Sequence, residues 1–169
     1  MRTLIKTKLR LPLLHRGKVR DIFDIDNKNM LIVTTDRLSA FDVVFDQPVP
    51  EKGMILTSIA NYWFQKTEHI IQNHLTGISL EEVLSKNEAE TLAGRAIVVK
   101  KLRPLAIEAV VRGYLIGSGW KEYLSSSEVC GIQLPQNMEL AQQLLKPLFA
   151  PSSKAGVGEH DANISFKDT

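Results

Sequence analysis

A chain of 169 residues, 44% of them hydrophobic, is long enough for one compact domain, or for one domain and part of a second. The net charge of +2, from 21 basic and 19 acidic residues, gives no overall basic field and argues against a nucleic-acid partner. Cys130 is the single cysteine, which excludes an internal disulfide and favours a reducing compartment. Because no apolar run reaches membrane-spanning length, we expect a cytoplasmic protein without a membrane partner.

The first predicted element in chain order is a β-hairpin. Residues 18–25 alternate apolar and acidic side chains towards their end, and residues 30–36 contain a β-branched run. Between them, residues 26–29 have the Asp and Asn content of a turn. The sequence therefore predicts two adjacent antiparallel strands.

Helical patterns follow the hairpin. Apolar residues recur at roughly helical spacing over residues 55–75, and Gly77 lies just past the end of this predicted helix. Ser79 with Glu82 forms a capping box, which predicts a short helix over residues 80–86.

The second half of the chain mixes strands and helices. Residues 95–102 and 105–114 have the pattern of two strands, broken by Arg103–Pro104, and residues 120–126 favour a short helix. Strands come first and helices are inserted among later strands, without a regular βαβ repeat. This order indicates the α+β class.

Gly17 and Lys18 lie just before the first predicted strand. A glycine and a lysine at a strand edge can bring backbone N–H groups and an ammonium group to a phosphate. The spacing is not that of the GxxxxGK[ST] phosphate loop. From these residues alone, a plain turn with solvated basic side chains is the more economical interpretation.

Four polar residues follow the second predicted strand within seven positions: Asp36, Arg37, Ser39 and Asp42. Loops beyond strand ends often carry binding residues, so this segment is a candidate site. The alternative is a turn into a short helix in which Asp36 is the cap and pairs with Arg37. The residues leave both interpretations open.

Arg112 and three nearby glycines raise a similar choice. The guanidinium group offers a planar set of donors suited to carboxylate or phosphate, and Gly117-Ser118-Gly119 would let a ligand approach the main chain. The alternative is a glycine turn with Arg112 in a surface ion pair. The GxGxxG spacing of dinucleotide sites is absent, because residues 120–122 contain no third glycine.

Residues 149–166 are rich in small side chains and contain one acidic-histidine run, Glu159-His160-Asp161. Adjacent residues do not converge on one ion, so we expect no metal site here. The segment is consistent with a surface loop or with a mobile lid.

Four segments together resemble the phosphoribosylaminoimidazole-succinocarboxamide synthase (SAICAR synthase) family. They are GKVRDIFDI (17–25), LIVTTDRLSAFDVVFDQPVPEKGMILTSIANYWF (31–64), IEAVVRGYLIGSGWKEY (107–123) and PLFAPSSKAGVGEHDANISF (147–166). They are in the family's order and spacing, and the E-x-V-V-R-G-Y-x-x-G-S segment is highly specific. Ala150 stands where the family usually has threonine. The family continues with a D-x-K-x-E-F-G strand, which nothing here matches.

The resemblance implies an ATP-dependent ligase of purine biosynthesis. Its reaction joins a carboxyaminoimidazole ribonucleotide to L-aspartate through an acyl phosphate. The residues that it assigns to ATP are Gly17, Lys18, Val19, Arg20, Lys100 and Leu102, with the adenine near the last two. Those that it assigns to the substrates are Asp36, Arg37, Ser39, Arg112, Ser118 and Lys154, the last of them in a loop that closes on the site. No catalytic residue is identified, and the ligands of the magnesium ion are expected outside this chain.

The resemblance also implies the architecture. Residues 1–101 would form a β-rich N-terminal lobe, kinase-like in outline, and residues 102–169 would begin a larger ATP-grasp-like lobe. We therefore expect the chain alone to be inactive and to self-associate. The family does not predict an oligomeric state, since its members vary.

Two other functions remain open. One is a different ATP-dependent small-molecule kinase, and the other is a non-catalytic module that binds nucleotides or RNA. Phe23, Phe41 and Trp63 have core-like patterns without interleaved basic residues, which argues against RNA.

Overall fold

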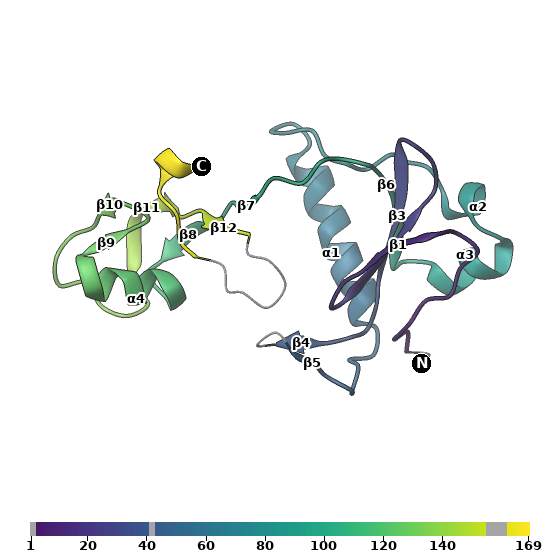
Figure 1. Ribbon diagram of the computed structural model, residues 1–169, viewed down its shortest axis with the longest axis horizontal. Coiled ribbons are helices and arrows are strands. Elements are labelled where there is room, and N and C mark those ends of the chain that lie inside the picture. The colour runs from purple at the N-terminus through teal and green to yellow at the C-terminus, as the bar shows by residue number, and fades with distance from the viewer. Residues whose placement is uncertain (1–2, 41–42, 155–161) are drawn as a thin grey trace. The chain divides into compact units, whose positions relative to one another are not determined.

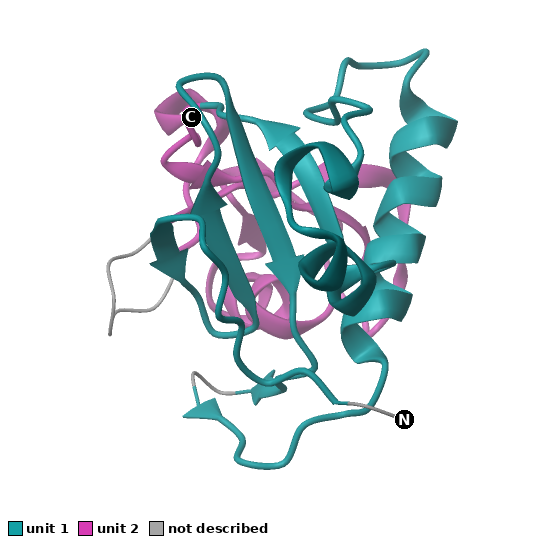
Figure 2. Cartoon of the chain, turned by 90° about the vertical axis from the view of Figure 1, so that its right-hand side faces the viewer, with its two compact units in different colours: residues 1–102 teal, residues 103–169 magenta. Residues whose placement is uncertain are grey.

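The computed structural model describes residues 3–40, 43–154 and 162–169. The chain divides into two compact units, residues 1–102 and residues 103–169 (Figure 2). The predicted boundary after residue 101 is one residue from this division. Each unit has its own cluster of buried hydrophobic side chains, so each can be described by itself.

Unit 1 is built on a four-stranded antiparallel sheet (Figure 1). Its strands are, in spatial order, β1 (Leu13–Arg16), β2 (Arg20–Asp24), β3 (Asn29–Thr34) and β6 (Ala96–Lys100). The predicted hairpin is confirmed as β2 and β3, with Ile22 opposite Ile32. In the turn, Asp26 Oδ1 accepts hydrogen bonds from the N–H groups of Lys28 and Asn29, at 2.7 and 2.8 Å. Separately, β4 (Ser39–Ala40) pairs antiparallel with β5 (Val43–Val44).

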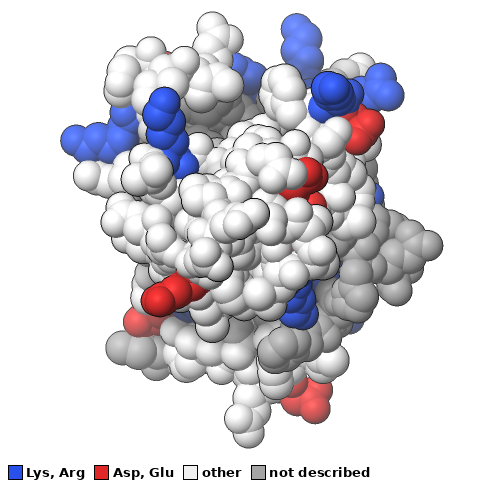
Figure 3. All heavy atoms as spheres, turned by 90° about the vertical axis from the view of Figure 1, so that its left-hand side faces the viewer, with Lys and Arg blue, Asp and Glu red and all other residues white. Residues whose placement is uncertain are grey.

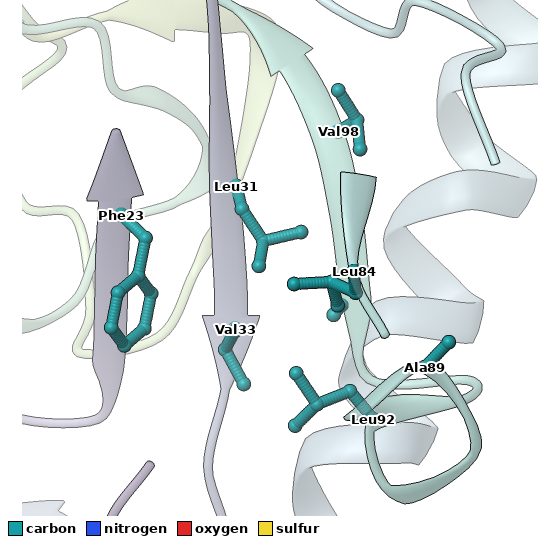
Figure 4. Close-up of a cluster of buried hydrophobic side chains, with 8 residues drawn as sticks. Phe23, Leu31, Val33, Leu84, Ala89, Leu92 and Val98 are labelled. Atoms are coloured by element: carbon teal, nitrogen blue, oxygen red, sulfur yellow. The ribbon is translucent and has the colours of Figure 1, made fainter. Parts of the chain in front are cut away.

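One face of this sheet carries the hydrophobic core of unit 1. Alternate side chains on the strands point to this face, because the side-chain period of a strand is two. Two short helices, α2 (Leu80–Val83) and α3 (Lys86–Leu92), lie at this face. Figure 4 shows side chains of β2, β3 and β6 together with Leu84, which follows α2, and with side chains of α3. The buried residues of this cluster are Phe23, Leu31, Val33, Leu84, Ala89, Leu92, Ala96 and Val98. Burial of each large apolar side chain in this cluster stabilises the folded state by about 1.5–3 kcal/mol.

The predicted helix over residues 80–86 is interrupted, because Ser85 begins a second helix. The Ser79–Glu82 capping box is confirmed, and Ser79 N–H donates to Glu82 Oε1 at 2.8 Å. Ser85 repeats the arrangement with Glu88, whose Oε2 accepts from Ser85 N–H at 3.0 Å and from its hydroxyl at 2.5 Å. These hydrogen bonds lower the pKa of Glu88 to about 2.

Helix α1 (Lys52–Thr67) covers the other face of the sheet, and it approaches β3 at a glycine. A Cβ atom on Gly53 would lie 2.3 Å from the main-chain oxygen of Thr34. One turn later, the hydroxyl of Thr57 lies 3.1 Å from that of Thr34 and donates a hydrogen bond to it. Small residues thus bring the helix against the backbone of the strand.

The predicted limits of this helix, 55–75, are wrong at both ends. The helix begins at Lys52 and ends at Thr67. Further along, Leu75 forms a β-bridge with Val99, and Lys100 N–H donates to the carbonyl of His74 at 2.9 Å. Pairing with the free edge of β6 satisfies backbone groups that a longer helix would have to satisfy itself.

The apolar residues that suggested this helix are largely exposed. They are Ile55, Ile59, Tyr62, Trp63, Ile70 and Ile71. The core-like position predicted for Trp63 is wrong, because 59% of this residue is exposed. The prediction for Phe23 is confirmed at 2% exposure, and Phe41 lies outside the described residues. Because α1 turns the side of Gly53 and Thr57 to the sheet, Ile55, Ile59, Tyr62 and Trp63 lie on its exposed sides.

Two buried ion pairs connect distant segments of unit 1. Asp21 Oδ1 lies 2.8 Å from Arg37 Nη2, and Asp36 Oδ2 lies 2.8 Å from Arg95 Nη1. Asp36 also accepts hydrogen bonds from the N–H groups of Leu4 and Gly53, at 2.8 and 2.9 Å. The carboxylate of Asp36 therefore joins the N-terminal segment, the start of α1 and the residue before β6.

Both carboxyl groups are held in their charged form. Burial alone would raise the pKa of Asp36, but hydrogen bonds from Leu4, Arg95 and Gly53 outweigh it and lower the pKa. The same balance lowers the pKa of Asp21, where burial is outweighed by hydrogen bonds from Arg37 and Thr7. Stability from such groups is present above their ordinary pKa and is lost as pH falls through the lowered value.

Unit 2 consists of short antiparallel strand pairs and one helix, α4 (Gly117–Ser126). The pairs are β7 (Ile107–Glu108) with β12 (Ser152–Ser153), β8 (Val111–Tyr114) with β11 (Gln143–Phe149), and β9 (Glu128–Val129) with β10 (Ile132–Gln133). A 3₁₀ turn spans Phe166–Asp168. The strand predicted over residues 105–114 is thus two short strands, while the predicted helix begins three residues early. Helices and antiparallel sheets confirm the α+β class.

The core of unit 2 forms around α4. Its buried members are Leu115, Tyr123, Val129, Cys130, Leu144, Leu148 and Ala150. The hydroxyl of Tyr123 donates to the carbonyl of Pro135 at 2.7 Å and accepts from Met138 N–H at 3.0 Å. This one phenol therefore anchors the loop between β10 and β11 to the helix.

The surface is mixed in charge. On the face drawn in Figure 3, the Lys and Arg side chains are separated by uncharged atoms and form no continuous basic surface. The absence of a nucleic-acid partner stays a prediction. Within the described part of the chain, the helices are too short or too polar to cross a bilayer.

We expect Gly53→Ala to lower the free energy of unfolding by at least about 1–3 kcal/mol, since the new methyl group meets backbone that cannot move aside cheaply. Urea unfolding followed by fluorescence measures this. The matched control is Gly113→Ala, where a Cβ atom has no neighbour within 4 Å, and its effect should stay within about 0.5 kcal/mol. Equal stability of the two variants would contradict the close approach of α1.

We also expect Asp36→Asn to destabilise the protein by about 3–5 kcal/mol at pH 7, because it leaves the buried guanidinium of Arg95 without its counter-charge. The control is Asp24→Asn, which removes a partly exposed partner of Lys101 and should cost less than about 1 kcal/mol. Because the pKa of Asp36 is lowered, the gap between wild type and Asp36→Asn should close as pH falls below about 4. A gap that widens in acid would refute the assignment.

Candidate functional site

The turn at Gly17 and Lys18 joins β1 to β2, and hydrogen bonds to its carbonyl groups fix its conformation. Gly17 N–H donates to the carbonyl of Arg20 at 2.8 Å, which closes the turn. The carbonyl of Val19 accepts from Thr35 N–H at 3.0 Å and from its hydroxyl at 2.7 Å. The turn is therefore a built structure rather than an unconstrained loop.

Arg37 holds the two remaining carbonyls of this turn. Its Nη2 donates to the carbonyl of Gly17 at 2.9 Å, and its Nε donates to that of Lys18 at 3.0 Å. The structure thus brings together the first two predicted groups of site residues, 17–20 and 36–39, within unit 1. Arg37 is only 8% exposed and contacts the turn, and its predicted contact with substrate stays a prediction.

Asp36 caps a helix, but this helix is α1 and not the short helix that was predicted to follow Asp36 directly. The alternative interpretation paired it with Arg37 and placed it at a helix that follows directly. It pairs instead with Arg95, and its carboxylate accepts from Gly53 N–H in the first turn of α1. The partner that satisfies Asp36 is distant in sequence, which local patterns do not show. Its predicted role towards substrate stays a prediction.

Ser39 begins β4, opposite Val44, and is partly exposed. Asp42 lies outside the described residues, as do Glu159, His160 and Asp161. Among residues 3–40, 43–154 and 162–169, no three His, Cys, Asp or Glu side chains converge closely enough to hold a metal ion.

A cavity of about 290 Å³ adjoins the turn on the α1 side of the sheet. Val19 and Arg20 contribute to its wall. The remaining wall comes from the sheet, from α1 and from the segment after it: Ile32, Thr34, Leu56, Thr57, Ala60, Phe64, His74 and Ile97. Burial and the nearby charge of Arg20 lower the pKa of His74. The cavity is mainly apolar and has one cation at its wall, which suits a ring attached to an anionic group.

The two residues predicted to face adenine lie at the end of β6. Lys100 N–H is already bonded to His74, whereas Leu102 is 62% exposed. Neither residue lines the cavity beside the turn. Their predicted contact with the base stays a prediction.

In unit 2, Arg112 and Ser118 meet at the N-terminus of α4. Arg112 lies on β8, and its Nη2 donates to the hydroxyl oxygen of Ser118 at 2.9 Å. Its Nε is buried and has no hydrogen-bond partner among the described residues. Gly119 makes room for it, because a Cβ atom there would lie 3.2 Å from that nitrogen. The glycine therefore permits the guanidinium to lie against the helix.

This corner has the chemistry of an anion site. The first turn of α4 contains no acidic residue, and its early N–H groups carry the positive end of the helix dipole. A guanidinium, a hydroxyl and a helix N-terminus converge there. Phosphate is the group that such a set of donors binds best.

Lys154 follows β12 at the edge of unit 2. Its N–H donates to the carbonyl of Ala106 at 3.1 Å, and its side chain is exposed. The residues after it are outside the described part of the chain. Its predicted place in a closing loop stays a prediction.

Sequence reasoning overlooked three residues that shape unit 1: Thr7, Asp21 and Arg95. Thr7 donates hydrogen bonds to Asp21 through both its N–H and its hydroxyl. Arg95 directly precedes the apolar run of β6, but charged residues are mostly exposed, so local sequence did not show that it is buried and paired. No local signal marked Thr7.

Two curated relatives match most of the length of this chain. The chain is 59% identical over 152 residues to phosphoribosylaminoimidazole-succinocarboxamide synthase of Neisseria meningitidis serogroup B, covering 90% of this chain and 53% of that protein. It is 56% identical to the same enzyme of Dechloromonas aromatica, covering 92% and 50%. The chain therefore spans about half the length of the curated relatives it matches.

A solved structure and a family model agree with these relatives. The structure of SAICAR synthase from Saccharomyces cerevisiae complexed with SAICAR superposes with a TM-score of 0.86 at 38% identity, over 96% of this chain and 56% of that one. The family model described as SAICAR synthetase matches residues 13–169. The chain belongs to the SAICAR synthetase family.

Proposed function

We propose that this chain forms the N-terminal half of an ATP-dependent ligase that joins a carboxyaminoimidazole ribonucleotide to L-aspartate. Family membership and the names of the most similar relatives support this proposal. They favour it over a small-molecule kinase or a non-catalytic module. In this proposal unit 1 is the kinase-like lobe, and unit 2 begins the ATP-grasp-like lobe.

The observation that carries the proposal is the convergence of Arg112, Ser118 and the N-terminus of α4. A ribonucleotide brings a phosphate that needs several fixed donors, and this corner supplies them without a neighbouring acidic group in the first turn. The yeast relative was solved with the reaction product bound, and it shares this part of the fold.

The reaction explains why two anion-binding regions are needed. A carboxylate is a poor electrophile, so its oxygen first attacks the terminal phosphorus of ATP, which releases ADP and forms an acyl phosphate. The amine of aspartate then attacks the acyl carbon, and phosphate leaves as the amide forms. Fixed cations and N–H groups that hold both phosphorylated molecules in place lower the barrier. We assign ATP to the turn in unit 1 and the ribonucleotide to Arg112 and Ser118.

Magnesium accompanies ATP in such reactions and neutralises its phosphate charge. The described residues do not offer a cluster of carboxylates for it. We propose that its ligands belong to the half of the family's length that this chain does not span.

We expect Arg112→Lys to weaken binding of the ribonucleotide by about 1–3 kcal/mol, because one ammonium group cannot replace a planar fork of donors. Calorimetry on the chain measures binding, and aspartate-dependent ADP release from the intact synthase measures activity. The control is Arg10→Lys, the same change at an exposed position paired with Glu88. Unchanged affinity for the ribonucleotide in Arg112→Lys, with unchanged activity, would sink the proposed function of this corner.

We expect Lys18→Ala to raise the apparent Michaelis constant for ATP, with less change for the ribonucleotide and aspartate. The matched control is Lys28→Ala, a lysine in the turn at the opposite end of β2, which should alter kinetics by no more than about 0.5 kcal/mol. Initial-rate kinetics with each substrate varied in turn separates these effects. If both lysines behave alike, Lys18 is an ordinary surface residue.

A further inference from the structure

We propose that Arg37 is a positioning residue that turns the amide groups of the Gly17–Lys18 turn towards the phosphates of ATP. This inference rests on the proposed function of that turn. It concerns a residue that contacts protein on every side, so it assigns Arg37 a role through the backbone rather than through direct contact with a ligand.

The guanidinium group of Arg37 is almost fully occupied. Its Nε donates to the carbonyl of Lys18, its Nη1 to the carbonyl of Ile5 at 2.6 Å, and its Nη2 to both Gly17 and Asp21. Four of the five N–H donors of an arginine are therefore used inside unit 1. Only one N–H, on Nη1, is left for a direct bond to a substrate, so the paired recognition of a carboxylate or phosphate would require at least one of these contacts to break.

The contacts with Gly17 and Lys18 orient two successive peptide groups. The described residues contain no cis peptide bond, and in a trans peptide the carbonyl and the following N–H point in opposite directions. Because the carbonyls of Gly17 and Lys18 point to Arg37, the N–H groups of Lys18 and Val19 point away from it. Successive N–H groups on one side of a turn form an anion-binding concavity.

Thr35 extends the same arrangement by one residue, since its N–H and hydroxyl both bind the carbonyl of Val19. The carbonyls of residues 17–19 are thus all drawn inwards by the segment after β3. Val19 and Arg20 also line the adjoining cavity. The amide side of the turn and the cavity therefore belong to one region of unit 1, where a nucleotide could place its phosphates and its apolar part.

Charge strengthens this assignment. Arg37 and Arg16 both contact Asp21, at 2.8 and 3.3 Å, so one carboxylate is shared by two guanidinium groups and the cluster retains a positive charge. Arg16 also donates to the carbonyl of Thr7 and, unlike Arg37, forms no hydrogen bond with the carbonyls of the turn within the described part of the chain. Arg16 is therefore a matched control with the same charge and the same acidic partner.

The test compares Arg37→Met, Arg37→Lys and Arg16→Met in the 169-residue chain. Binding of ADP is measured by calorimetry, and the amide signals of Lys18 and Val19 are followed by NMR with and without ADP. We expect both Arg37 variants to bind ADP at least about tenfold more weakly, because methionine has no donor and lysine lacks the planar fork that places separate N–H groups on the carbonyls of Gly17 and Lys18. In both variants the amide signals should already move in the absence of ADP. Arg16→Met should keep the signals and stay within about threefold of wild-type affinity.

Two further readouts separate positioning from general stability. Arg37→Lys keeps a charge beside Asp21 and serves if Arg37→Met does not fold. In the intact synthase, Arg37→Lys should raise the Michaelis constant for ATP and leave that for the ribonucleotide within about twofold of wild type, whereas a merely structural loss would lower turnover without this division.

The outcomes distinguish the two proposals. If ADP leaves the amide signals of Lys18 and Val19 unchanged in the wild-type chain, and Lys18→Ala leaves the Michaelis constant of the intact synthase for ATP unchanged, the nucleotide assignment of the turn is overturned, and the positioning role with it. If wild type binds ADP and a folded Arg37→Lys variant binds it equally well, with unshifted Lys18 and Val19 signals, the positioning role alone is overturned. A loss of ADP binding in Arg16→Met as large as in Arg37→Met would also overturn it, since charge alone would then account for the effect.

Discussion

The shared carboxylate of Asp21 is the interaction on which the polar side of unit 1 depends. It is completely buried, and it binds Arg37, Arg16 and Thr7, which come from three different segments. A buried carboxylate is costly unless its charge is paired and its lone pairs are occupied. Once Asp21 is satisfied in this way, Arg37 is fixed, and Arg37 in turn fixes the carbonyls of the Gly17–Lys18 turn. The conformation of a surface turn is thus set by a buried ion pair.

A second buried ion pair is formed by Asp36, the residue next to Arg37. Asp36 pairs with Arg95 and also receives the first-turn N–H of Gly53, so it joins β6 to the start of α1. The close approach of Gly53 to Thr34 then places α1 on the sheet, where it walls the cavity beside the turn. Adjacent residues, Asp36 and Arg37, therefore serve two structural networks. This accounts for their dense polar segment without a bond from either side chain to a ligand.

In the proposed ligase, the two units would bind anions by different physical means. In unit 1, arginine is buried and acts on backbone groups, which would leave the amides to face a phosphate. In unit 2, Arg112 lies beside Ser118 at a helix N-terminus, where its own donors can reach a ligand. The proposed reaction brings two phosphorylated molecules together, and the negative charges of these two molecules repel each other. Both anion-binding regions are therefore required to hold them. The proposed ligase function combines these two solutions in one chain.

The sequence by itself determined the hairpin of β2 and β3, the capping box at Ser79, the α+β class and the family, because each depends on local pattern or on motif order. The end of α1, the exposure of Trp63 and the partners of Asp36 and Arg37 were decided by the tertiary structure. In each case the deciding contact is distant in sequence: His74 pairs with the edge of β6, and Asp36 with Arg95. Periodicity shows that apolar side chains share one face of a helix or strand, but it does not show which part of the protein packs against that face. A buried charge likewise takes the partner that the fold brings to it.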